Sequence, residues 1–149
     1  MRLNESVGAV LTHKGRGVLM VRPEASVFGA LRVMDEQNVG ALVVMDGERL
    51  VGVLSERDYT RKVALQGRSS RSTRVIDIAD RRLVTVTPDE DVEECMRLMT
   101  QLRVRHLPVV ERGELVGLVS MGDLVKWVIT SQDATIQQLV HYITGTYPA

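Results

Sequence analysis

Aromatic residues are scarce in this chain of 149 residues, at 3% of the composition. A hydrophobic core must therefore come from aliphatic side chains, and a hydrophobic fraction of 44% is enough to build one. Cys95 is the single cysteine, which excludes an internal disulfide framework and suits a reducing compartment. We therefore expect a cytoplasmic protein. Because Met96 and Met99 share its apolar helical face, we expect Cys95 to be a small buried hydrophobe.

Excess charge and long apolar runs are also missing. Nineteen basic and nineteen acidic residues give a formal net charge of zero. A general nucleic-acid binder needs surplus positive charge, so no nucleic-acid partner is expected. No apolar run approaches the ~18 residues of a membrane span, and the N-terminus lacks the pattern of a signal peptide. We expect no membrane partner, and any anion must be bound by a local cluster of cations.

The usual signatures of catalysis and metal binding are not seen. No Cys/His cluster has metal-ligand spacing, and neither a P-loop nor a Gly-x-Ser-x-Gly motif occurs. The Gly15–Gly17 stretch lacks the third glycine of a dinucleotide loop, and a predicted strand follows it instead of preceding it. No nucleophile with an adjacent base is visible. We expect a protein that is not an enzyme and holds no metal.

An internal repeat is the most informative feature of the sequence. When residue n is placed over residue n+65, positions 23–63 and 88–128 align without a gap and are identical at 13 of 41 positions. Leu50-Val51-Gly52 falls on Leu115-Val116-Gly117. Self-similarity at this period indicates one duplicated structural unit.

Each copy has the pattern strand, helix, strand, strand, helix. We predict strands at 18–21 and 83–86, helices with apolar spacing at 27–34 and 92–99, and strand pairs at 40–45 with 50–54 and 107–110 with 115–119. Asp46-Gly47 and Arg112-Gly113 are the predicted turns. A second helix is predicted to begin at Ser55 and at Ser120. The fold class is therefore α/β.

The predicted divisions are a first repeat at 7–66, a linker at 67–74, a second repeat at 75–132, and a C-terminal helix and tail at 133–149. The linker is polar, rich in serine and basic, so we expect its arginines to be solvated. The extra helix is predicted between Thr135 and Thr144, with Ile136, Leu139, Val140 and Ile143 on one face. These apolar side chains favour a homodimer.

The repeated phrase Leu-Val-Gly, two apolar residues, Ser, two further residues and Asp resembles the cystathionine β-synthase (CBS) domain, as does the stretch from Arg103 to Val109. Two such copies form the pair known as a Bateman module. The resemblance implies two repeats related by a pseudo-twofold axis. It also implies clefts between them for AMP, ATP, S-adenosylmethionine or NAD(H), and dimerisation into a disc.

On this resemblance we expect a regulatory module that binds an adenosine-containing ligand, AMP or another adenine nucleotide or NAD(H). Its conformational change would signal to a partner protein that the sequence does not identify. The alternative is a structural interaction module that binds no nucleotide. A thermal shift with these ligands distinguishes the two.

Ser55 with Asp58, and Ser120 with Asp123, stand where a strand meets a helix. One interpretation is a capping box that satisfies the free N–H groups of each helix start. The other is ligand contact, because a carboxylate can accept both hydroxyls of a ribose; in the family that aspartate holds the ribose. We expect at least one of the two aspartates to do so.

Arg103, Arg105 and His106 are three potential cations in four residues. They form either a solvated helix end or a phosphate clamp, for which Arg105 and His106 are the candidates. The first copy has Gly40 and Ala41 instead. Because Asp123 lies in the same copy as the cations, we expect its motif to serve the tighter phosphate-bearing ligand.

Weaker candidates for ligand contact are Arg57, Arg61, Arg22 and Thr87, which stand where family clefts are lined. For each of them simple exposure to solvent is the competing interpretation.

Overall fold

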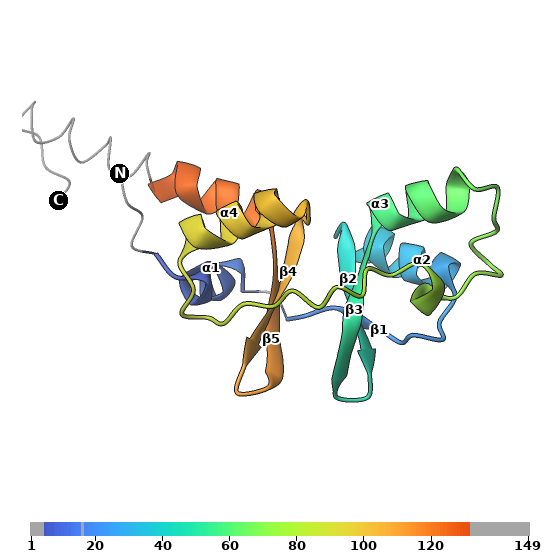
Figure 1. The fold of residues 1–149 in the computed structure, drawn as a ribbon, viewed down its shortest axis with the longest axis horizontal. Coiled ribbons are helices and arrows are strands. Elements are labelled where there is room, and N and C mark those ends of the chain that lie inside the picture. The colour runs from blue at the N-terminus through green and yellow to red at the C-terminus, as the bar shows by residue number, and fades with distance from the viewer. Residues whose placement is uncertain (1–4, 16, 132–149) are drawn as a thin grey trace, which may run out of the picture.

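A computed structural model describes residues 5–15 and 17–131. Two similar units lie side by side (Figure 1). Each has a β-hairpin whose turn lies at the lower end of the view and helices at the upper end. The predicted α/β class and the duplicated unit are confirmed. In chain order the elements are α1 (Val7–Lys14), β1 (Met20–Val21), α2 (Val27–Gln37), β2 (Ala41–Asp46), β3 (Arg49–Ser55), α3 (Glu56–Tyr59), η1 (Thr60–Ala64), η2 (Val75–Asp77), α4 (Val92–Leu102), β4 (His106–Glu111) and β5 (Glu114–Ser120), followed by helix at 121–131.

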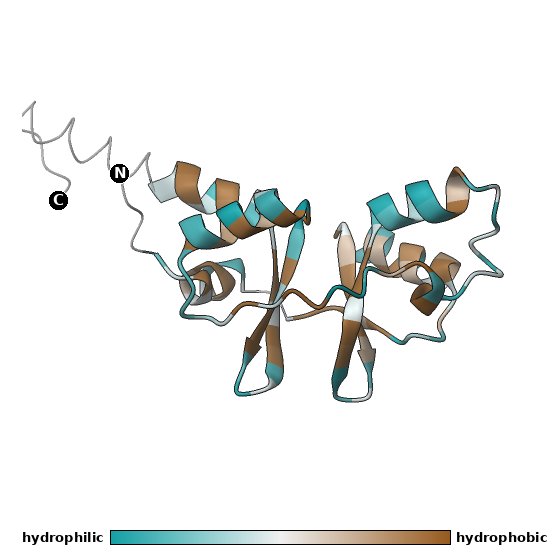
Figure 2. Cartoon of the chain, in the orientation of Figure 1, coloured by the Kyte–Doolittle hydropathy of each residue, from teal (hydrophilic) through white to brown (hydrophobic). Residues whose placement is uncertain are grey.

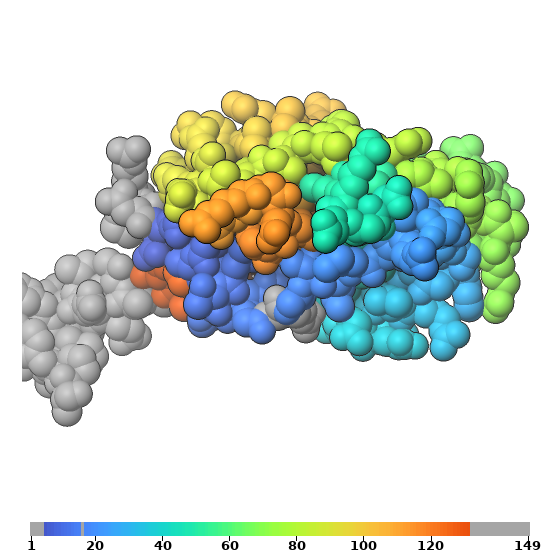
Figure 3. Space-filling model, turned by 90° about the horizontal axis from the view of Figure 1, so that it is seen from below, coloured from blue at the N-terminus to red at the C-terminus, as the bar shows by residue number. Residues whose placement is uncertain are grey.

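The hairpins match between the units. β2 pairs with β3 and β4 with β5, both antiparallel, and each ladder shifts register at equivalent points, Val44/Met45 and Val109/Val110. Most residues in the middle of each hairpin are hydrophobic, and those at its turn are hydrophilic (Figure 2). Seen from the hairpin tips, the teal and orange hairpins lie next to one another, with blue N-terminal chain on one side and green-yellow connector on the other (Figure 3).

The first strand of each repeat is shorter than predicted. β1 covers only two of the residues 18–21 and pairs in parallel with β2. Residues 83–86 form no strand, and only Val86 bridges to Val109. The reason lies in the partner strand. In the first unit the N–H of Val43 donates to the carbonyl of Leu19 over 3.1 Å, but the equivalent residue in β4 is Pro108, which has no N–H to give.

Each of the two cores includes residues that the sequence assigned to the other repeat, at 7–66 or at 75–132. Val7 and Val10 of α1 are buried in the core of the second unit, with Val92, Met99 and Leu107. Val75 and Ile78 are buried in the first core. Matching hydrogen bonds fix both segments: Val7 N–H donates to the Glu90 carbonyl and Val75 N–H to the Ala25 carbonyl, each over 2.8 Å. The α1 helix itself was not predicted.

The connection at 67–74 is docked on the first unit instead of being fully solvated. Thr73 is buried, and its carbonyl accepts a hydrogen bond from the Val27 N–H. The Arg71 guanidinium lies 3.9 Å from the centre of the Phe28 ring, a cation–π contact. The predicted helix at 135–144 lies outside the described residues. None of the described helices combines the length and apolar character that a membrane crossing requires.

Candidate functional site

Two clefts lie where the units meet. The larger has a volume of about 690 Å³ and the smaller about 220 Å³. The larger is lined by residues from 52–62 of the first unit, 80–84 of the segment between η2 and α4, and 102–108 of the second unit. The smaller is lined by the reverse combination, with 38–41 from the first unit and Leu118, Ser120 and Asp123 from the second, plus Lys14 and 17–19. The pseudo-twofold relation of the repeats therefore places both clefts between copies and neither within one copy.

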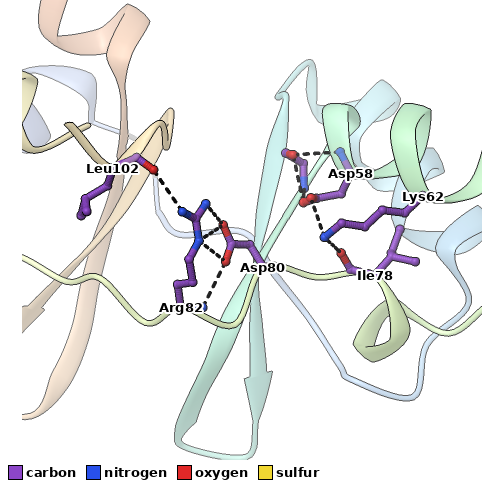
Figure 4. Close-up of polar contacts among 7 residues, drawn as sticks. Asp58, Lys62, Ile78, Asp80, Arg82 and Leu102 are labelled. Atoms are coloured by element: carbon purple, nitrogen blue, oxygen red, sulfur yellow. Dashed lines mark hydrogen bonds and ion pairs between the residues drawn. The ribbon is translucent and has the colours of Figure 1, made fainter. Parts of the chain in front are cut away.

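Asp58 lies on the wall of the larger cleft, at the start of α3. Its Oδ2 accepts hydrogen bonds from the Ser55 N–H (2.9 Å) and hydroxyl (3.0 Å), while the Asp58 N–H donates to Ser55 Oγ. The predicted capping box is thus present. The Lys62 ammonium lies 3.3 Å from Asp58 Oδ1 and donates to the Ile78 carbonyl over 2.9 Å (Figure 4). Since a carboxylate offers about four lone-pair directions, Oδ1 keeps capacity for a ligand hydroxyl.

Asp123 has the equivalent position in the smaller cleft. The Ser120 N–H donates to Asp123 Oδ2 over 2.9 Å, and the Asp123 N–H donates to Ser120 Oγ. Lys14, from the end of α1, donates to the same Oδ2 over 2.8 Å and to the Leu118 carbonyl over 3.1 Å. Burial opposes ionisation of Asp123, but the hydrogen bonds from Lys14 and Ser120 outweigh it and hold its pKa below the ordinary value.

The cations that follow α4 lie in the larger cleft, with Asp58. Arg103 and Arg105 line that cleft only, and the smaller cleft has Asn38 and Gly40 at the equivalent places. The expectation that the Asp123 motif shares the phosphate clamp was therefore wrong for Arg105. That expectation assumed that all residues of one cleft come from one copy. In the structure each cleft takes its aspartate from one copy and the residues between helix and hairpin from the other copy.

His106 lines both clefts and stands between them. Burial lowers the pKa of His106 below its ordinary value, and the partly compensating charges of Asp123 and Asp58 do not restore it. Its imidazole is therefore neutral at pH 7 and can donate or accept a hydrogen bond without adding charge. Without ligand His106 therefore adds no positive charge near neutral pH, and Arg105 is the candidate for the predicted phosphate clamp that lines the larger cleft only.

A hydrogen-bond network that was not predicted from the sequence crosses the rim of the larger cleft. Asp80 exchanges two backbone hydrogen bonds with Val53 in β3. Its carboxylate binds the Arg82 guanidinium at 2.6 Å, and Arg82 also donates to the Leu102 carbonyl at the end of α4 over 3.0 Å (Figure 4). The Arg82 bonds lower the pKa of Asp80. This hydrogen-bond network joins the two units, and no motif in the sequence indicates it.

The remaining predicted residues divide into two groups. Arg57 and Arg61 line the larger cleft, as Ser55 does, and Ser120 lines the smaller. Arg22 is exposed and paired with Glu24, and Thr87 is exposed; neither lines a cleft, because both stand at turns beside the repeat prolines.

The remaining points concern the Cys95 thiol and the side chains that could bind a metal ion. Burial raises the pKa of the Cys95 thiol to about 11, which leaves it protonated and unreactive. Among residues 5–15 and 17–131, no three His, Cys, Asp or Glu side chains gather in a way that could hold a metal ion.

Comparison with known proteins places these features in a family context. A model of the CBS domain matches residues 7–65 and 75–130. The mitochondrial CBS domain-containing protein CBSX3 of Arabidopsis thaliana is 40% identical over 151 residues, covering 95% of this chain and 73% of that protein. The CBS domain-containing protein YhcV of Bacillus subtilis is 33% identical over 117 residues, covering 78% of this chain and 83% of that protein.

Solved structures agree with this match. A protein with CBS domains from Burkholderia ambifaria, proposed to act in signal transduction, is 45% identical with a TM-score of 0.81, covering 85% of this chain and 96% of that chain. A CBS-domain protein from Agrobacterium tumefaciens is 35% identical with a TM-score of 0.77, covering 81% of this chain and 97% of that chain.

Proposed function

This chain belongs to the CBS domain family as a tandem CBS pair, and from that premise we propose that it is a regulatory module that binds an adenosine-containing ligand in its larger cleft. One observation carries the proposal. A carboxylate at a helix start, Asp58, shares one cleft of about 690 Å³ with several arginines. That volume lies within the ~300–1,000 Å³ typical of small-molecule sites, whereas the 220 Å³ of the smaller cleft lies below it.

The lining of the larger cleft suits the three parts of a nucleotide. Val53, Val84 and Val104 offer apolar contact for an adenine ring. Asp58 Oδ1 can accept a ribose hydroxyl, and Arg57 and Arg105 can donate to phosphate oxygens. AMP, another adenine nucleotide and NAD(H) all present these groups. Because the cleft walls come from both units, a bound ligand would shift the angle between them and so signal to a partner protein.

Calorimetric titration with AMP, ATP, NADH and S-adenosylmethionine tests the proposal. We expect at least one to bind and to raise the melting temperature further as its concentration is increased above its Kd. The competing function is a structural interaction module. It is favoured by the capping bonds that Asp58 and Asp123 already make, and the absence of binding by all four ligands would support it and contradict ours.

Three further properties belong to this proposal. The regions matched by the family are the two CBS repeats, and we propose no catalytic activity. We propose a homodimer because Val125 and Ile129, one helical turn apart, are 38% and 54% exposed on the helix at 121–131; a monomer in light scattering at tens of micromolar would contradict this. We propose a reducing compartment, with the cytoplasm as the first candidate, although the Arabidopsis relative is mitochondrial.

A further inference from the structure

Four arginines in the larger cleft have no acidic partner within the described residues. Lys62 is paired with Asp58 and Arg82 with Asp80. Arg57, Arg61, Arg103 and Arg105 line the same cleft, and none of them takes part in an ion pair with residues 5–15 or 17–131. These guanidiniums come from both walls, two from the first unit and two from the second. Among the carboxylates of the lining, only that of the exposed Glu56 is without an ion pair within the described residues, so it is the one that could compete with a ligand for these guanidiniums.

The charge of the lining exceeds what a nucleoside monophosphate neutralises. Six cationic side chains face three carboxylates, Glu56, Asp58 and Asp80, which gives a net charge of +3 with His106 neutral. A phosphate monoester carries about −1.5 to −2 at pH 7, and each further phosphate adds about one more negative charge. A concave cleft focuses the field of its charges. A diphosphate or triphosphate therefore matches the cleft better than a monophosphate.

The same residues argue against the magnesium complex of such a ligand. Protein sites for Mg²⁺-bound phosphates usually supply one or two carboxylates to the metal. Here Asp58 and Asp80 are already paired with Lys62 and Arg82, with the Asp80–Arg82 contact as short as 2.6 Å, so Glu56 is the one lining carboxylate without an ion pair among the described residues. Magnesium would also cancel two of the ligand charges that the unpaired guanidiniums can bind. In this cleft arginine supplies the positive charge that magnesium supplies elsewhere.

We propose that the larger cleft selects a nucleoside polyphosphate with three or more negative charges, in its metal-free form, over a monophosphate. The nucleoside part of this inference rests on the proposed function; the polyphosphate part rests on the four unpaired arginines alone. The two parts can therefore fail separately.

The test is calorimetric titration of the full chain with AMP, ADP, ATP and inorganic tripolyphosphate in EDTA, repeated for ATP with excess Mg²⁺. We expect ATP to bind at least about 10-fold more tightly than AMP, and Mg²⁺ to weaken ATP binding several-fold. Raised ionic strength should weaken the binding of ATP more than the binding of AMP. Equal affinity for AMP and ATP, or tighter binding with Mg²⁺, would overturn the inference and leave the proposed adenosine site intact.

Two variants on opposite walls identify the source of the selectivity. Arg57→Gln and Arg105→Gln should each lower ATP affinity roughly 10-fold, the lower end for hydrogen bonds to a charged group, because both side chains are exposed. AMP affinity should fall less. Arg49→Gln is the matched control, since Arg49 is an exposed arginine of β3 that lines neither cleft. Circular dichroism confirms that each variant is folded. If both cleft variants bind ATP as the control does, the arginines are merely solvated and the inference is wrong.

Tripolyphosphate separates the two failures. If it binds as tightly as ATP and more tightly than AMP, the polyphosphate selection stands and adenosine recognition is refuted. If it does not bind but ATP does, with AMP weaker, both parts stand. If no compound binds, both are overturned.

Discussion

The two clefts are built from equivalent segments yet differ in size, charge and internal contacts. The larger has about three times the volume of the smaller and a lining charge of +3, whereas Lys14 and Asp123 balance one another in the smaller. Asp58 is paired with a lysine of its own helical stretch, four residues on, while Asp123 is paired with a lysine from the far end of the chain. A duplicated unit therefore need not give two equal sites, because the segments that close each cleft are not themselves equal.

The largest expected effect contrasts the equivalent glycines Gly52 and Gly117. A Cβ at Gly52 would collide with the backbone carbonyl of Asp80, whereas at Gly117 it would meet the flexible end of the Leu11 side chain. Gly52→Ala should therefore destabilise the fold by about 3 kcal/mol and Gly117→Ala by about 1 kcal/mol. Urea denaturation of both variants measures this. Equal losses of stability in the two variants would show that the backbone at Asp80 shifts as easily as the Leu11 side chain.

The second prediction contrasts the two aspartates in ligand binding. Asp58→Asn removes a charged acceptor and should weaken nucleotide affinity by about 10- to 150-fold, equivalent to ~1.5–3 kcal/mol. Asp123→Asn should change it less than about twofold, since that carboxylate lies in the cleft that Lys14 spans. Calorimetry on both variants decides between them, and a larger loss for Asp123→Asn would reverse our assignment of the binding cleft.

The third contrast concerns the two lysines. Lys14→Met leaves the half-buried Asp123 without its partner and should cost about 1 kcal/mol at pH 7. Lys62→Met removes a half-exposed ammonium one helical turn from Asp58 and should cost about 0.3–0.5 kcal/mol, because Asp58 keeps its hydrogen bonds from the N–H and the hydroxyl of Ser55. Because the folded-state pKa of Asp123 is lowered, its stabilisation is complete above the unfolded value of 3.8 and is lost as pH falls through the folded pKa. The Lys14→Met deficit should therefore shrink below pH 3.8. A deficit that is unchanged down to acid pH would indicate lost packing instead.

The smallest effect concerns His106, which faces both clefts. Its pKa is lowered by burial, so the unfolded chain takes up the proton first as pH falls through about 6.5, and folding stability declines there. The sign is opposite to that of a histidine stabilised by a carboxylate. His106→Gln should flatten this part of the stability profile between pH 7.5 and 5.5, measured by urea midpoints. A wild-type profile that rises on acidification would show that Asp58 and Asp123 dominate over burial.

The repeat and its hairpins were predictable because they are local patterns: apolar runs of strand length with turn residues between them, duplicated at a fixed offset. The capping boxes at Ser55 and Ser120 followed from the same local logic. The missing strand at 83–86 could also have been read, since Pro108 removes the donor that a parallel partner needs. Arg105 was assigned to the wrong cleft because a sequence repeat does not reveal which copy supplies each wall. The roles of Lys14 and Arg82 could not be found, because the contacts of Lys14 with Asp123 and of Arg82 with Leu102 are set only by tertiary packing.

The exchange of segments between the cores also sets an order for folding during synthesis. The first core is complete only once Val75 and Ile78 have left the ribosome, well after its hairpin. The opposite holds for the second core. Its α1 helix is made before the rest of that core and must wait, with Val7 and Val10 unburied, until the chain has reached Leu124. Such late closure between distant segments slows folding. Neither repeat, released alone by proteolysis at the 67–74 connection, would carry its whole core, so we expect the pair to fold and unfold as one.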